Sequence, residues 1–158
     1  MADQTKAFHA SEKFAEHLQH LLADLIDLHL VGKQAHWNIV GSNFRDLHLQ
    51  LDEIVEAARG FADDIAERMR AVYVAADGRA QTVVKLSGLK AFAEGEISTS
   101  AAVDAIAEAL WEVARTARDI HDDIDEEDPT TADLLHQIIE RTEQLAWMVS
   151  AENRTPQH

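Results

Sequence analysis

Five side chains in the first half of the sequence have the types and the spacing of a metal site. His48 and Asp52 are four residues apart, as are Asp63 and Glu67, and His36 precedes both pairs. Residues four apart in a helix lie on one face, so each pair presents its two side chains together. Imidazole and carboxylate ligands in combination suit a borderline-to-hard divalent metal such as iron. The pattern therefore predicts an iron site built on helices.

One helix cannot bring these ligands together. At 100° per residue, His48, Asp52, Asp63 and Glu67 fall at roughly 0°, 40°, 60° and 100°, so they share one stripe. Asp52 and Asp63 lie roughly 16 Å apart along the axis, however, whereas a metal needs its ligands within roughly 2.5 Å. Pairing two copies antiparallel about residues 57–58 sets the first pair of one chain against the second pair of the other. We therefore expect a site shared between two subunits.

The expected two-fold contact has small residues at its midpoint. Ala57, Ala58 and Gly60 would allow two helices to approach closely there, and an isologous contact would create two equivalent iron sites. His36, near the end of the preceding helix, would supply another nitrogen. A di-iron centre within one subunit is disfavoured, because it requires Glu-x-x-His motifs on two helices and no Glu in this chain is followed three residues later by a His.

Four long helices are predicted from apolar residues that recur at steps of three and four. The first is expected over residues 11–37. The second begins after residues 41–43, where Ser42 or Asn43 can cap it, and frays near residues 77–78. The third starts near residues 98–99. The fourth follows Pro129, where Thr130 and Asp133 resemble a capping box.

The long connection over residues 76–97 suggests a crossover that holds its own short helix. The expected fold is therefore all-α, a ferritin-like four-helix bundle with a short helix between the second and third long helices, and no sheet is needed. We expect one domain over residues 1–158, with flexible tails at 1–10 and 152–158.

Composition limits the metal ligands and the cellular compartments that we expect for the protein. The 158 residues include no cysteine, which excludes thiolate metal ligands and permits a reducing compartment. There is no basic leader followed by an apolar run, and no stretch approaches the ~18 consecutive apolar residues of a membrane span. We expect a cytoplasmic protein, with association with the nucleoid left open, and no membrane partner.

The formal net charge of −15 means that the protein surface as a whole repels nucleic acid, which disfavours nucleic acid as a partner. Residues 1–13 hold Lys6 and Lys13 against Asp3 and Glu12, and residues 153–158 add no basic cluster. Seven acids fall within residues 119–128. Such a run is usually a solvated face, and at a helix C-terminus it opposes the macrodipole, so stability gives no reason for it.

The segment Lys33-x-x-His36-Trp37-Asn38-x-x-Gly41-x-x-Phe44-x-x-Leu47-His48-x-x-x-Asp52, followed by Asp63-x-x-Ala66-Glu67-Arg68, resembles the signature of the Dps family, the DNA-protection-during-starvation mini-ferritins. The resemblance covers essentially the whole chain and includes Leu145-Ala146-Trp147-Met148. It implies a hollow dodecamer that oxidises Fe(II), preferentially with hydrogen peroxide, stores ferric mineral and protects against oxidative damage.

The resemblance also implies roles for individual residues. The ferroxidase centre would contain His36, His48 and Asp52 of one subunit and Asp63 and Glu67 of its two-fold neighbour, with two iron sites at each two-fold interface. Trp37, beside the site, would intercept oxidising equivalents. Negatively lined pores on the three-fold axes would admit iron, and the candidates for their lining are Asp125, Asp128 and Asp133, although Asp133 is also a candidate cap.

Other functions fit parts of the pattern. The lysine-rich tail of DNA-binding family members is missing, yet a DNA-compacting or DNA-protecting protein with secondary iron chemistry remains an alternative. Two further alternatives are a helical bundle whose acidic residues only make it soluble, and a different chemistry at the interface site. Each proposed ligand alone would usually be a solvated helix residue, and Trp37 or Trp111 alone would usually be core. The remaining histidines are assigned to the surface or the core: His9, His17, His20, His29, His121, His136 and His158.

Overall fold

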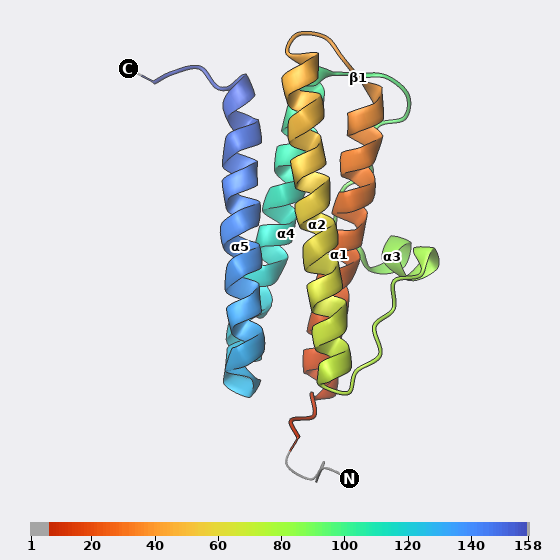
Figure 1. The fold of residues 1–158 in the computed structure, drawn as a ribbon, viewed down its shortest axis with the longest axis vertical. Helices are drawn as coiled ribbons and strands as arrows, with labels where there is room; N and C mark the ends of the chain where they lie inside the picture. Colours follow the sequence, from red (N-terminus) through yellow and green to blue (C-terminus); the bar gives the residue numbers. More distant parts are fainter. Residues whose placement is uncertain (1–6, 158) are drawn as a thin grey trace.

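The structure is a computed structural model that describes residues 7–157. The elements in chain order are α1 (Glu12–Asn38), β1 (Ile39–Val40), α2 (Phe44–Ala71), α3 (Ala80–Leu86), β2 (Ile97–Ser98), α4 (Thr99–Glu127), α5 (Pro129–Ser150) and the 3-10 turn η2 (Ala151–Asn153). The four long helices form one bundle (Figure 1). Helices α1 and α5 run in one direction and α2 and α4 in the other, so the predicted ferritin-like connectivity is confirmed.

The predicted apolar stripes form the core of the bundle. In α1 the stripe from Phe14 to Leu28 is buried, and the stripe from Val103 to Ile124 in α4 is buried in the same way. Phe61 of α2 and Leu134 of α5 are only partly buried against this core. Apolar burial on one face of each helix therefore holds the four helices together and fixes which faces remain free.

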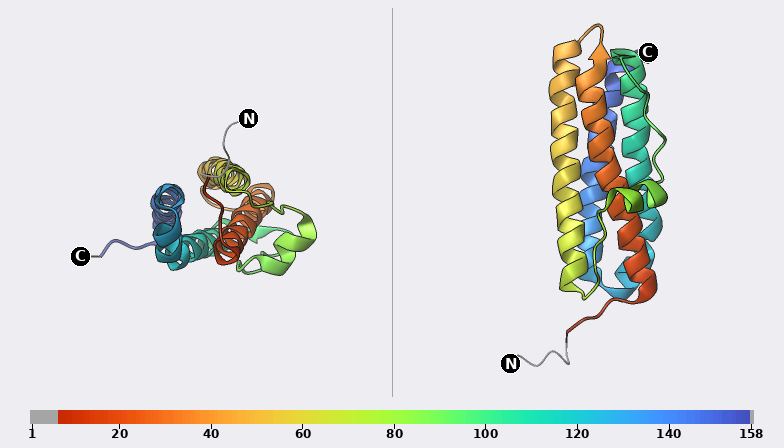
Figure 2. Two further views of the ribbon diagram at one scale, coloured as in Figure 1. Left: turned by 90° about the horizontal axis from the view of Figure 1, so that it is seen from below. Right: turned by 90° about the vertical axis from the view of Figure 1, so that its right-hand side faces the viewer.

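The crossover between α2 and α4 contains the predicted short helix. Figure 2 shows α3 on the outside of the bundle, next to α1. Asp24 of α1, 2% exposed, accepts hydrogen bonds from the backbone N of Gly88 and from Oγ1 of Thr116, each at 2.7 Å. Burial raises the pKa of the Asp24 carboxyl, against these hydrogen bonds. The crossover is thus anchored to α1 and α4 through one buried carboxylate.

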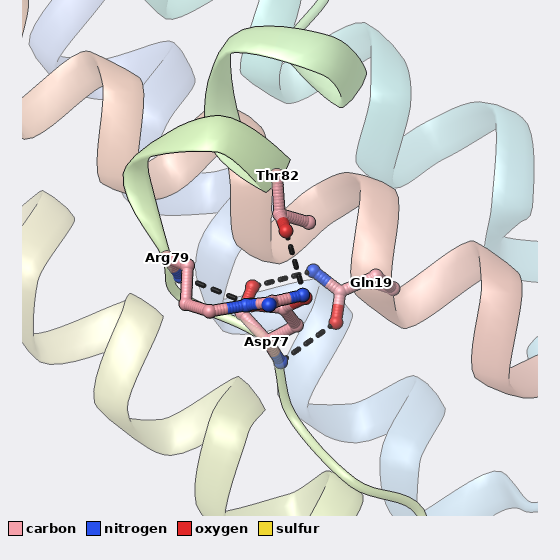
Figure 3. Close-up of polar contacts among 4 residues, drawn as sticks. All are labelled: Gln19, Asp77, Arg79 and Thr82. Carbon is pink, nitrogen blue, oxygen red and sulfur yellow. Dashed lines mark hydrogen bonds and ion pairs between the residues drawn. The ribbon is translucent and has the colours of Figure 1, made fainter.

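Helix α2 ends at Ala71, earlier than the expected fraying near residues 77–78. Tyr73 has a positive φ of 67°, a left-handed conformation that cannot continue a right-handed helix. A few residues later, Asp77 and Gln19 exchange hydrogen bonds at 2.9 Å between the backbone of Asp77 and the side chain of Gln19 (Figure 3). The Asp77 carboxylate also accepts hydrogen bonds from Arg79 and Thr82, which lower its pKa. Contacts with α1, distant in sequence, therefore set where the crossover begins.

The loops at one end of the bundle are joined by a short parallel strand pair of β1 with β2, a detail that the sequence pattern did not predict. Ile39 pairs with Ile97 and Val40 with Ser98. Gly41 follows with a φ of +128°, and a Cβ there would lie 3.0 Å from Oγ1 of Thr99. Only glycine fits this combination of backbone and space.

The start of α2 also differs from the expected cap. Asn43 occupies the N-cap position in the left-handed region, with a φ of 57°. Its side chain makes no capping hydrogen bond and instead donates to the carboxylate of Glu152, beyond α5. A contact with a residue distant in sequence thus takes the place of a local capping hydrogen bond.

The turn between α4 and α5 corrects the proposed capping box. The N-cap of α5 is Asp128, not Thr130, with Pro129 in the first turn. Asp128 accepts hydrogen bonds from the backbone N of Thr131 at 3.2 Å and from Arg68 of α2 at 2.6 Å. Two further acids of the same run have polar partners. Asp123 forms an ion pair with Lys13 at 2.7 Å, and Glu127 accepts a hydrogen bond from the Ser11 hydroxyl at 2.7 Å. The expectation that stability gives no reason for this acidic run is therefore wrong for three of its members.

The expected flexible tails fall partly on residues 1–6 and 158, which lie outside the described residues. Within the described part, the backbone N of Ala10 donates to Val72 O at 3.2 Å, and the Asn153 side chain donates to Ser100 O at 2.7 Å. None of the helices in residues 7–157 is long and apolar enough to cross a membrane.

Candidate metal centre

His36 and His48 meet where the end of α1 faces the start of α2. Their rings stack with centroids 3.6 Å apart. Nδ1 of His36 lies 2.9 Å from the backbone O of His48, and Nδ1 of His48 lies 2.9 Å from the backbone O of His36. His36 is 8% exposed. Each histidine is therefore held in place by the backbone of the other.

These reciprocal hydrogen bonds determine which ring nitrogen is free. A carbonyl oxygen can only accept, so each Nδ1 must carry the proton and donate it. In the neutral ring the Nε2 atom then keeps its lone pair, which is the form that binds a metal. The backbone thus presets both His36 and His48 as nitrogen ligands.

Asp52 lies beside the histidine pair, one helical turn after His48 in α2. Its Oδ1 is 2.6 Å from Nζ of Lys33 and 3.4 Å from Nδ1 of His36. The hydrogen bond from Lys33 is the main cause of a lowered pKa for the Asp52 carboxyl, with further contributions from the neighbouring histidines. The group is accordingly an anion at neutral pH, available to a cation.

Lys33 contacts the candidate ligand Asp52, and the sequence pattern assigned it no role. It stands on α1 and reaches Asp52 on α2, so no local spacing relates the two residues. Its position in the motif, one turn before His36, was the only signal. We interpret Lys33 as a positioning residue that orients the Asp52 carboxylate until a divalent cation takes its place.

Asp63 and Glu67 are exposed on α2, on the stripe that starts at His48 and Asp52. The axial separation along the continuous helix Phe44–Ala71 keeps them away from the histidine pair. Within the described part of one chain, no group of three or more His, Asp or Glu side chains is placed to hold a metal ion. The structure thus places Asp52 beside the stacked pair of His36 and His48, without forming a three-residue metal site in the described part of one chain, and it leaves Asp63 and Glu67 apart from them.

The small residues expected at the two-fold midpoint differ in their exposure to solvent. Ala58 is 2% exposed within its own bundle, so it is not available to a second subunit. Ala57 is partly buried against the core. Gly60 is exposed, and a Cβ there would meet nothing within 4 Å. Of the three, Gly60 alone offers open surface for a close approach.

Aromatic residues frame the histidine pair. The Phe44 ring lies 5.2 Å from the His48 ring and covers its outer side. Trp37, next to His36, is 70% exposed, so it is not the core residue that an isolated tryptophan would usually be. An exposed indole beside the histidine pair is accessible to oxidants in solution.

The three candidates for a pore lining have different surroundings. Asp125 and Asp133 are exposed, whereas Asp128 is 9% exposed and caps α5. The hydrogen bonds that Asp128 accepts from Arg68 and Thr131 hold it in its capping position. Asp125 and Asp133 remain the better candidates for a cation path.

Comparison with known proteins places the chain in a family. A ferritin-like domain matches residues 15–155. The DNA protection during starvation protein of Agrobacterium fabrum is 37% identical over 135 residues, which are 85% of this chain and 83% of the relative. DNA protection during starvation protein 2 of Deinococcus radiodurans is 34% identical over 140 residues, which are 89% of this chain but only 58% of the length of that relative.

A solved structure shows the same arrangement of helices. The Dps protein of Vibrio cholerae O1 is described as a member of a broad superfamily of ferritin-like diiron-carboxylate proteins, and it superposes with a TM-score of 0.85 at 25% identity. The match covers 90% of each chain. The chain described here therefore belongs to the ferritin-like family and, within it, to the DNA-protection-during-starvation (Dps) proteins.

Proposed function

We propose that this protein is a ferroxidase and iron-storage protein whose catalytic centres lie between two-fold related subunits. The observation that carries the proposal is the reciprocal pair of hydrogen bonds between His36 and His48. The two hydrogen bonds join α1 to α2 and leave each Nε2 lone pair in place, so the stacked imidazoles would supply two nitrogen ligands for Fe(II). Asp52 adds an anionic oxygen ligand.

A second copy would complete the ligand set. In the antiparallel pairing, Asp63 and Glu67 of the partner would face His48 and Asp52 of the first chain, and each interface would then hold two equivalent sites. If each site takes different ligands from two subunits, one chain alone is expected to hold only part of the ligand set together. The sites would require assembly, and the homo-oligomer that we propose is the hollow dodecamer implied by the Dps resemblance.

The proposed reaction is the oxidation of two Fe(II) by hydrogen peroxide, 2 Fe²⁺ + H₂O₂ + 2 H⁺ → 2 Fe³⁺ + 2 H₂O. The peroxide O–O bond breaks as two electrons arrive, one from each iron, so no hydroxyl radical is released. The carboxylates stabilise the higher charge of Fe(III). Ferric product would move into the interior of the oligomer, where acidic side chains lower the cost of gathering cations. Trp37 would intercept any one-electron oxidant that escapes.

The test is rapid mixing of the assembled, iron-free protein with Fe(II) without oxygen, followed by hydrogen peroxide or air. Ferric absorbance is compared between the wild type and a double variant, Asp52→Ala with Glu67→Ala. We expect fast oxidation by peroxide, slower oxidation by air, and loss of both in the double variant, by roughly 100-fold or more, because a metal site loses its affinity with its ligands.

A matched control separates ligand loss from charge loss. Glu53→Ala with Asp64→Ala removes the same charge from positions roughly 100° from Asp52 and roughly 60° from Glu67 around the same helix, and both side chains are exposed. This variant should oxidise Fe(II) at the wild-type rate. Equal rates in the wild type and the ligand variant, with size-exclusion profiles unchanged, would refute the proposed site.

The relatives are named for DNA protection, which favours DNA protection as a second candidate function. Removal of Fe(II) and peroxide would protect DNA without contact, in keeping with a net charge of −15. Direct binding would instead require clustered Lys and Arg and would weaken steeply with salt. A gel-shift assay over a range of salt concentrations decides between the two: protection of DNA from peroxide and iron without a shifted band supports the indirect route.

A further inference from the structure

A second pair of histidines meets on the outer surface of the bundle, away from the proposed iron site. His121 lies near the end of α4 and His136 in the second turn of α5. Their Nε2 atoms are 2.7 Å apart, and their ring centroids are 4.6 Å apart. They line a surface pocket of about 440 Å³ between the two helices. Their ring edges therefore converge on one point that is open to solvent.

The outward nitrogens of this pair face carboxylates. Nδ1 of His121 is 3.0 Å from Oδ1 of Asp122, and Nδ1 of His136 is 3.6 Å from Oδ1 of Asp133. A carboxylate that accepts the Nδ1 proton fixes the tautomer in which Nε2 is free, and it increases the basicity of the ring. His121 therefore has the supporting carboxylate that is typical of a metal-binding histidine, and Asp133 lies near His136 but beyond hydrogen-bond distance.

We propose that His121 and His136 bind a divalent first-row transition metal of the zinc type through their two Nε2 atoms. Metal–nitrogen bonds of 2.0–2.1 Å at tetrahedral or octahedral angles place two such nitrogens roughly 2.9–3.3 Å apart. The two rings would need to separate by only a few tenths of an ångström. Imidazole nitrogen suits zinc, copper, nickel and ferrous iron, and water would complete the coordination.

The surrounding charge favours a cation. The pocket is lined by Asp122, Glu140 and Glu143 against one cation, Arg118. The Arg118 guanidinium is already paired with Glu143 at 2.6 Å, which raises its pKa. The field at the two Nε2 atoms is therefore negative, and the nearest positive charge is neutralised.

This site is separate from the proposed ferroxidase and does not rest on it. The simpler alternative is that the two imidazoles only share a proton, as a hydrogen-bonded pair that helps to hold α4 against α5. That alternative predicts no metal-dependent change. The two possibilities differ in whether zinc binds when the interface ligands are absent.

The experiment is calorimetric titration of Zn(II) into the assembled oligomer in a background that carries His36→Gln, His48→Gln, Asp52→Ala and Glu67→Ala, which lacks four of the five proposed interface ligands. Zinc has no redox chemistry, so the readout is independent of iron oxidation. We expect one zinc ion per subunit, with binding at least roughly tenfold weaker after either His121→Gln or His136→Gln. His20→Gln, an exposed histidine on α1, is the matched control and should leave the binding unchanged.

A second measurement needs no substitution at either histidine. Diethyl pyrocarbonate modifies free imidazoles, and mass spectrometry of the background protein reports which histidines react. Zn(II) should protect His121 and His136 together, while His20 stays reactive. No zinc bound in the background protein, or binding and protection that do not involve these two residues, would overturn the proposal.

Discussion

His36 and His48 show how a tautomer is set by the chain itself. Each Nδ1 is bonded to the backbone carbonyl of the other histidine, whereas His121 and His136 direct their Nδ1 atoms to carboxylates. In the first pair each Nε2 atom keeps its lone pair, whereas in the second pair the two Nε2 atoms lie within hydrogen-bond distance of each other, 2.7 Å apart. The sequence predicted the first pair, because it lies in a dense pattern of ligand types. It could not predict the second, since the two residues meet only through the α4–α5 turn.

Asp128 shows that a single carboxylate in an acidic run can be structural. We expect Asp128→Ala to lower the free energy of unfolding by roughly 2–4 kcal/mol, because it removes a helix cap and leaves Arg68 without its partner. Asp125→Ala, at an exposed position of the same run, should be neutral within about 0.5 kcal/mol. Thermal unfolding at one fixed protein concentration measures both.

The effect of Asp128 should depend on pH. Burial tends to raise the pKa of its carboxyl, but the hydrogen bonds from Thr131 and Arg68 outweigh burial and lower it overall. Because the pKa is lower in the folded state, the ionised carboxyl stabilises the fold fully above the unfolded pKa of about 3.9. This stabilisation is lost as the pH falls through the folded pKa. The gap in melting temperature between wild type and Asp128→Ala should therefore close below about pH 4. A gap that widens in acid would contradict this account.

The helices themselves were predictable, because each carries a long apolar stripe and three of the four begin at a residue whose type signals it: Ser11, Ser98 and Pro129. The parts that sequence reasoning missed depend on contacts between distant segments. The strand pair of Ile39 with Ile97 forms only when two loops meet, and α2 stops at Ala71 where the following segment is held by α1. In the site, the ligand stripe was predictable and the Lys33–Asp52 contact was not, for the same reason.

The contact between α1 and α2 depends on one glycine. A Cβ at Gly32 would lie 2.7 Å from Cγ2 of Val55, a buried side chain. We expect Gly32→Ala to destabilise the protein by about 1–3 kcal/mol, since overpacking outweighs the gain in helix propensity. Adding Val55→Ala should recover part of that loss, giving a favourable coupling between the two sites. Thermal unfolding of the two single variants and the double variant measures it, and strictly additive effects would argue against the close contact.

At the scale of the whole molecule, the two-fold pairing makes a charge prediction. The register that sets Asp52 against Asp63 of a partner also sets Glu56 against Arg59, and both residues are exposed on α2. Glu56→Arg or Arg59→Glu alone should place like charges in contact and weaken assembly. The double swap should restore it. Analytical ultracentrifugation distinguishes these results, and a double variant no better assembled than either single one would exclude this register.

The most direct measurement of the central claim, that each iron site is shared between two subunits, is complementation in mixed oligomers. Chains carrying only Asp52→Ala and chains carrying only Glu67→Ala are unfolded together, mixed in equal amounts and refolded. If the ligands come from two chains, one of the two sites at each mixed interface is intact, and random mixing restores about one quarter of wild-type Fe(II) oxidation by peroxide. If all the ligands belong to one chain, every site carries a defect, and the mixture would be as inactive as either parent.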